Sequence, residues 1–277
     1  MTPILKDIFK STIKSLEILY VLEGAKPSAR IMVSEKDEAQ VEGFVSQKGL
    51  SYVKSNFKVV KQDKDKVYSD KGLRVPIDSQ TQGYFFAYIS KDMEKSLRAR
   101  ELEEKGMHRE LGLMLGYPSC CSQFFFERFS LESQRSNDFT LAALDNSKGI
   151  TFPYQNNIAA RHFDHALLSH FPCSFNCPKS LEIAKRNLSV IDKHDRELAL
   201  KMAAFLQTGV LYTEDKGVFL LRNMRIEGNN AYYGEVTSNT KNELYDRLMK
   251  SGEIKLIGGN IVVEGLIIKK AGLMNFR

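Results

Sequence analysis

The sequence predicts an α+β fold in three consecutive parts. These are a small N-terminal α/β unit over residues 1–91, a central helical region over 92–207 that carries every cysteine, and a C-terminal strand-rich α+β domain over 208–277. Three observations predict this division. Short β-branched and aromatic runs dominate up to residue 90, apolar residues then recur at helical spacing up to residue 207, and strand-like runs return after Gly209.

The N-terminal unit is predicted from short alternating segments. Its predicted elements are an apolar run at 16–22, a strand at 30–33, a helix at 35–47, a strand at 51–60, a charged solvent-facing turn at 61–65, and strands at 66–69 and 83–90. The last strand contains Tyr84-Phe85-Phe86-Ala87-Tyr88-Ile89, whose aromatic content is the strongest strand signal of the unit. Nothing in this unit indicates catalysis.

The central region is predicted to contain helices joined at two proline turns. A charged helix over 92–115 ends at Gly116, and Ser119 is expected to cap a second helix over 120–129. A third helix over 154–169 ends before Pro172, and a long helix follows Cys177, with apolar residues spaced three or four apart as far as residue 205.

The C-terminal domain is predicted from strand-like runs. Strands are expected at 217–226, 231–237, 254–257 and 261–268, with a helix at 241–250. The last two strands are expected to form a hairpin through Gly258-Gly259-Asn260. This part has the pattern of a binding or dimerisation module.

Composition bounds the class of protein. With 277 residues, 43% of them hydrophobic and 27% charged, the chain is long enough for one large or two modest domains with hydrophobic cores. Charges interrupt the first apolar stretches, and no run reaches membrane-spanning length, so we expect a cytoplasmic protein without membrane contact. The formal charge of +6 is compatible with an anionic small molecule, a nucleotide or RNA as partner.

All four cysteines fall in two close pairs, Cys120 with Cys121 and Cys173 with Cys177. Each pair lies beside a proline turn at the expected start of a helix, where unpaired backbone N–H groups and the helix dipole favour thiolates. A reducing cytoplasm disfavours two disulfides. If the two corners face each other, the four sulfurs form a metal site.

The spacing within the pairs favours iron over zinc. One pair is adjacent and the other is separated by three residues, whereas zinc ribbons and knuckles use two-residue gaps. We therefore predict an iron-sulfur cluster, with a four-iron four-sulfur (4Fe-4S) cluster favoured and zinc as the alternative. Adjacent cysteines point about 100° apart on a helix. Either all four sulfurs bind, or three bind and leave one iron open to substrate, a small thiol or His170. The fourth cysteine then packs as a small buried apolar residue or acts in catalysis.

Three of the five histidines precede the second cysteine pair. On a helix, Asn157, Arg161 and His165 would share one stripe, with His162 beside it. We predict a substrate side in which Arg161 binds an anionic group and His162 or His165 transfers protons. A solvated helix face explains the same pattern.

The motifs around these cysteines resemble a known family. The sequence Gly116-Tyr117-Pro118-Ser119-Cys120-Cys121, the stretch 156–162, and the sequence His170-Phe171-Pro172-Cys173-Ser174-Phe175-Asn176-Cys177 are similar to an uncharacterised, mainly archaeal, prokaryotic family, domain of unknown function four-eight-three. The resemblance covers about residues 105–190. It implies a shared site and no particular reaction.

Three functions are compatible with these patterns. The favoured one is a metalloprotein, and an iron-sulfur-dependent enzyme if it is catalytic, with redox, Lewis-acid, sulfur or hydrolytic chemistry on a small or nucleotide-like anion. The alternative is a zinc-stapled RNA- or protein-binding module without catalysis. A thiol enzyme with Cys120 and Cys121 as a vicinal redox pair is disfavoured, because adjacent cysteines form a strained disulfide.

Overall fold

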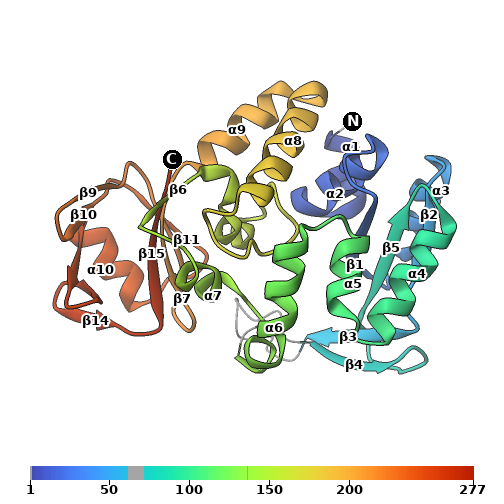
Figure 1. Ribbon diagram of the computed structural model, residues 1–277, viewed down its shortest axis with the longest axis horizontal. Coiled ribbons are helices and arrows are strands. Elements are labelled where there is room, and N and C mark those ends of the chain that lie inside the picture. The colour runs from blue at the N-terminus through green and yellow to red at the C-terminus, as the bar shows by residue number, and fades with distance from the viewer. Residues whose placement is uncertain (1, 62–71, 136) are drawn as a thin grey trace.

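The computed structural model describes residues 2–61, 72–135 and 137–277, and it has the α+β architecture that the sequence predicts (Figure 1). The N-terminal part lies at the right of that view, the C-terminal part at the left, and the central helices between them. The predicted turn over 61–65, apart from its first residue, and the predicted strand over 66–69 lie outside the described residues.

The N-terminal part is a sheet flanked by helices. Its elements are α1 (Thr2–Phe9), α2 (Thr12–Leu22), β1 (Ser28–Ser34), α3 (Glu38–Gln47), β2 (Ser51–Lys54), β3 (Phe57–Lys61), β4 (Gly72–Pro76) and β5 (Tyr84–Ser90). Strand β5 pairs antiparallel with β1, β2 and β3. The single strand predicted over 51–60 is wrong, because the chain turns at buried Ser55. The Ser55 hydroxyl donates to the Phe57 carbonyl (2.6 Å) and accepts from the Phe86 amide (3.1 Å).

The central part is helical, but its helices are shorter than predicted. Its elements are α4 (Met93–Glu104), α5 (His108–Met114), α6 (Ser119–Arg135), α7 (Thr140–Asp145), β6 (Thr151–Phe152), the 3-10 helices η1 (Tyr154–Asn156) and η2 (Ile158–Phe163), α8 (Pro178–His194) and α9 (Arg196–Leu206). The helix predicted over 92–115 breaks at Gly106, whose φ of 65° ends α4. The long helix after Cys177 breaks at Asp195, whose carboxylate caps α9 at the Leu198 amide (2.9 Å).

The helix predicted over 154–169 is wrong. The segment forms two short 3-10 helices and then irregular chain. Buried Asn157 caps η2 by accepting from the Ala160 amide (3.3 Å) and donates to the Leu206 carbonyl (2.9 Å). Asp164 has a φ of 59°, and its carboxylate accepts a hydrogen bond from Ser11 (2.6 Å) at the start of α2. These side-chain bonds replace the helical ladder.

The C-terminal part adds one five-stranded sheet and four strands of a second sheet, whose fifth strand is β6 of the central part. Its elements are β7 (Gly209–Thr213), β8 (Gly217–Leu221), β9 (Arg225–Glu227), β10 (Asn230–Tyr232), β11 (Val236–Ser238), α10 (Glu243–Ser251), β12 (Glu253–Ile257), β13 (Asn260–Val263), β14 (Leu266–Ile268) and β15 (Ala271–Phe276). The predicted hairpin is confirmed, with Ile257 opposite Asn260 and positive φ at both Gly258 and Gly259. The runs predicted as single strands over 217–226, 231–237 and 261–268 are each divided between two strands.

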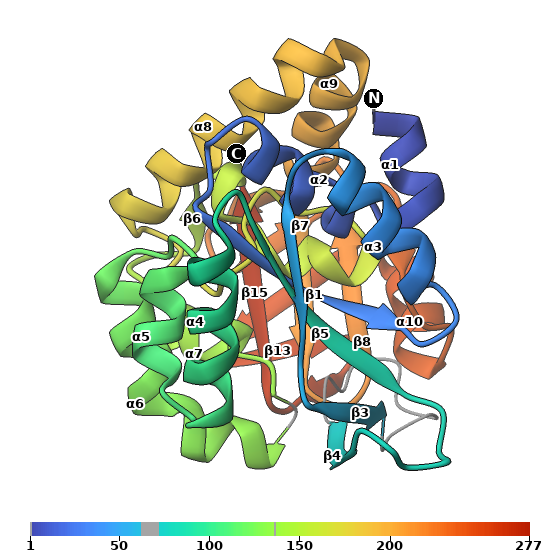
Figure 2. The same ribbon diagram turned by 90° about the vertical axis from the view of Figure 1, so that its right-hand side faces the viewer.

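The three parts share buried contacts. One core cluster contains Leu16, Val45, Ile191, Met202 and Phe276, and so extends from the N-terminal helices to the last strand. In addition, β6 of the central part pairs in parallel with β15. Figure 2 shows the N-terminal sheet from the front, with α4, α5 and α6 grouped beside it. Within the described residues, no helix combines the length and the apolarity needed to cross a membrane.

Candidate metal centre

The two cysteine pairs face each other in one compact group, as the sequence predicts. Cys120 and Cys121 lie in the first turn of α6, Cys173 lies in the loop before α8, and Cys177 caps α8. The Sγ atom of Cys121 lies 3.9 Å from that of Cys120 and 3.7 Å from that of Cys177, and the Sγ atoms of Cys120 and Cys177 are 3.8 Å apart. All four Sγ atoms lie within 4.8 Å of one another. These soft donors together can hold a metal ion.

Local contacts of the chain fix both corners. Gly116 has a φ of 79° and ends α5 against Pro27, where a Cβ at position 116 would stand 2.6 Å from Pro27 Cδ. Ser119 is the first residue of α6 rather than its cap. At the other corner, buried Asn156 donates to the carbonyls of Phe175 (3.0 Å) and Cys177 (3.3 Å). The loop and α8 are thereby held together.

Two hydrogen-bond donors support the Cys121 sulfur. The Cys173 amide donates to it at 3.3 Å, and the Ser180 hydroxyl lies 3.2 Å away. Ser180 Oγ in turn lies 2.9 Å from His170 Nε2. His170, a predicted ligand, is therefore outside the group of four sulfurs and one hydrogen bond further from Cys121. Burial and the nearby charge of Lys26 lower the pKa of His170 to about 3, so its ring is neutral.

The crowded thiols shift one another's pKa values. Hydrogen bonds from Cys121 and Cys173 hold the pKa of Cys177 far below its usual range. The contacts with Cys173 and Cys177, together with burial, raise the pKa of Cys121. The Cys177 thiolate is therefore stabilised by hydrogen bonds from the neighbouring protonated thiols. A bound cation would stabilise the deprotonated form of all four sulfurs in this partly buried place.

Arg161 and His162, both predicted on the substrate side, meet at an aspartate that the sequence did not single out. The fully buried carboxylate of Asp138 accepts from Arg161 Nη2 (2.8 Å) and contacts His162 Nε2 (3.0 Å). Burial raises the pKa of Asp138, but the charge of Arg161 and the hydrogen bond with His162 outweigh burial and hold that pKa well below its usual range. The one sequence signal that could have pointed to Asp138 was its position just before a helix that begins at Thr140.

His165, the third residue predicted on the substrate side, lies elsewhere. Its ring stacks on Phe205 of α9 (4.1 Å between ring centroids), and its Nδ1 lies 2.7 Å from the Phe163 carbonyl. The predicted stripe does not form, because the segment is not an α-helix and its residues point in different directions.

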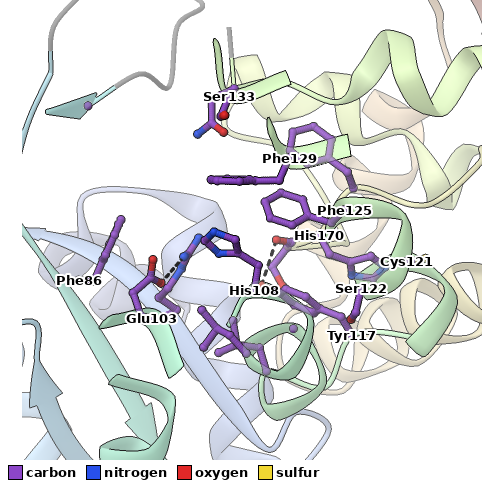
Figure 3. A pocket seen from close by; sticks show the side chains of 18 of the residues that line it. Phe86, Glu103, His108, Tyr117, Cys121, Ser122, Phe125, Phe129, Ser133 and His170 are labelled. Atoms are coloured by element: carbon purple, nitrogen blue, oxygen red, sulfur yellow. Dashed lines mark hydrogen bonds and ion pairs between the residues drawn. The ribbon is translucent and has the colours of Figure 1, made fainter. Parts of the chain in front are cut away.

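A cavity of about 550 Å³ adjoins the cysteines (Figure 3). Cys121, Arg161, His170 and Phe171 line it on the side of the metal centre. Residues of the N-terminal part and of α4 and α5 line the opposite side, among them Arg30, Arg74, Glu103 and His108.

Comparison of the chain with protein-family models, with curated proteins and with solved structures found no match in any of the three. The resemblance of the cysteine motifs to the domain of unknown function stays a prediction.

Proposed function

We propose that the four cysteines bind a single zinc ion in tetrahedral coordination, and that this ion holds together the wall of a ligand-binding cavity. The sulfur separations carry the proposal. With Zn–S bonds of about 2.3 Å, the corners of a regular tetrahedron lie about 3.8 Å apart. The three separations among Cys120, Cys121 and Cys177 are 3.7, 3.8 and 3.9 Å.

The same separations favour zinc over the iron-sulfur cluster that the motif spacing predicts. A four-iron cluster is held by thiolates on four different irons, so its ligand sulfurs stand further apart than the sulfurs around one ion. Four thiolates also fill a tetrahedral coordination sphere. That is the pattern of structural zinc sites, whereas catalytic zinc keeps one position for water or substrate.

The proposed role is to fix α6 against α8. Cys120 and Cys177 are 57 positions apart in the chain, and their contact joins the first turn of one helix to the cap of the other. When bound, the ion would supply a tetrahedral cross-link. The Cys173 amide and the Ser180 hydroxyl would stabilise the charge on the Cys121 sulfur and orient it.

Metal analysis of protein purified without oxygen tests this proposal. We expect one zinc per chain, no visible colour, and, after replacement of zinc by cobalt, the intense visible d–d bands of a tetrahedral thiolate site. Brown protein with about four irons per chain and a broad thiolate-to-iron charge-transfer band would contradict the proposal and support the iron-sulfur alternative.

The Ser180→Ala protein is expected to bind zinc about 10-fold more weakly, because the Cys121 sulfur loses a supporting hydroxyl and His170 Nε2 loses its partner. Competition with a chromophoric chelator measures the affinity. Ser189→Ala is the matched control, because Ser189 lies on the same helix, is exposed and contacts only the Lys185 carbonyl by its hydroxyl within the described residues. Equal affinity of the two variants would show that Ser180 has no role at the centre.

A further inference from the structure

The cavity beside the metal centre has the size of a small-molecule site. Its volume of about 550 Å³ lies within the range of about 300–1,000 Å³ that is usual for such sites. It lies between the N-terminal part and α6, so that two parts of the chain provide its walls. Figure 3 shows Phe86 and Glu103 at one side and Cys121, Ser122 and Tyr117 at the other, with Phe129 above.

One end of the cavity is positively charged. The buried carboxylate of Glu103 accepts one hydrogen bond from Arg30 Nη1 (2.5 Å) and one from Arg74 Nη2 (2.8 Å). The side chains of Arg30 and Arg74 are 34% and 46% exposed. Two guanidinium groups against one carboxylate leave one positive charge in excess. Each guanidinium carries five N–H groups, so donors remain for an anion after the bonds to Glu103 that the described residues show.

Next to this charged end, the wall presents flat aromatic surfaces. Phe125 and Phe129 lie one turn apart on α6, with ring centroids 5.4 Å apart, and the His108 ring lies 4.0 Å from that of Phe129. Burial lowers the pKa of His108, which keeps its ring neutral. Such a wall suits a planar ring, because every nucleobase has a face that stacks on aromatic side chains.

A polar group within the cavity wall lacks a partner. Ser122 is 3% exposed and lines the cavity, and its hydroxyl has no hydrogen-bond partner among the described residues. Buried hydroxyls are normally hydrogen-bonded. Gly112 faces it, and a Cβ there would stand 2.6 Å from Ser122 Oγ. The glycine thus lets α5 and α6 pack closely at Ser122.

We propose that this cavity binds a nucleotide, with its base on the wall formed by Phe125, Phe129 and His108 and its phosphate on Arg30 and Arg74. A double guanidinium end suits a phosphate, and the aromatic wall suits a base. The inference rests on the proposed zinc centre only in that the ion would hold the start of α6 in place. The nucleotide is either free or part of a single-stranded RNA.

A tryptophan introduced at the wall tests the proposal. The chain has no tryptophan, so Phe129→Trp places a single tryptophan at the cavity wall. We expect saturable quenching by at least one of AMP, GMP, CMP and UMP. Binding should be weaker by about tenfold or more for the corresponding nucleoside, and also for the same protein carrying Arg74→Gln.

Arg225→Gln, at an exposed arginine paired with Glu227 in the C-terminal part, is the matched control and is expected to change nothing. Calorimetry repeats the titration on the unmodified protein.

The outcomes of these titrations distinguish a free nucleotide from a nucleotide within RNA. They also distinguish failure of the nucleotide proposal from failure of the zinc proposal. Tighter binding of a free nucleotide than of a mixed-sequence single-stranded RNA supports a free ligand, and the reverse order supports a nucleotide within RNA. Zinc-loaded protein that binds neither at millimolar concentration, or that binds nucleosides as tightly as nucleotides, overturns the proposal. Iron in place of zinc in the same samples overturns the proposed metal and leaves nucleotide binding to be decided by the titration alone.

Discussion

The Cys177→Ser protein is expected to lose its metal ion and, with it, the folded structure of the central part. The Cys177 sulfur is buried and lies 3.7 Å and 3.8 Å from the sulfurs of Cys121 and Cys120, and Cys177 is the N-cap residue of α8. Structural zinc contributes about 10–16 kcal/mol in zinc-finger peptides. That is as large as the whole unfolding free energy of a typical domain, about 5–15 kcal/mol. Circular dichroism is expected to show loss of helix at 25 °C or a melting temperature many degrees lower.

Ser174→Ala provides the control for this substitution. Ser174 lies in the same loop, and among the residues that the structure describes its one hydrogen bond is accepted by its carbonyl from the Cys177 amide (3.0 Å). This variant is expected to keep one zinc per chain and the melting temperature of the natural sequence. A strong chelator should lower the melting temperature of the Ser174→Ala protein to that of the Cys177→Ser protein. It should not change the melting temperature of the Cys177→Ser protein. Normal melting of metal-free protein would contradict a structural role for the ion.

The convergence of the cysteines was predictable because its signals are local. A helix-ending glycine before Pro118 and a turn at Pro172 place each pair at the start of a helix, and a shared site is a natural way to use four thiols in a reducing environment. The kind of metal is a separate question from this convergence, because two different quantities bear on it. The motif spacing counts residues along the chain, whereas the Sγ separations depend on how closely two distant turns approach each other.

The predicted helical stripe of Asn157, Arg161 and His165 does not form, for a related reason. The segment 154–169 has apolar and polar residues at helical spacing, but the hydrogen bonds that decide its shape join Asn157 to Leu206 and Asp164 to Ser11, 49 and 153 positions apart. A sequence window contains no information about such partners. Asp138 was missed because it lies in a short aperiodic run, although it is the residue that brings Arg161 and His162 together.

Replacement of Asp138 is expected to have the second large effect, a loss of stability. The Asp138→Asn protein should lose about 3–5 kcal/mol of unfolding free energy, because Arg161 and His162 would face a neutral amide in place of a buried carboxylate. Urea unfolding measures the loss. Asp145→Asn, at an exposed aspartate at the end of α7, is the matched control and is expected to stay within about 0.5 kcal/mol of the natural sequence.

The loss of unfolding free energy in the Asp138→Asn protein should also depend on pH. The pKa of Asp138 is lowered in the folded protein, so the unfolded chain protonates this carboxyl at a higher pH than the folded protein does. The stabilisation is therefore complete above the unfolded pKa of about 3.9 and declines as the pH falls below that value. The difference between the natural sequence and Asp138→Asn should shrink in that range. The comparison uses the pH range in which both proteins still unfold cooperatively, because protonation of the thiolates would also release a bound ion. A difference that grows as the pH falls would show that Asp138 is not held as a carboxylate by Arg161.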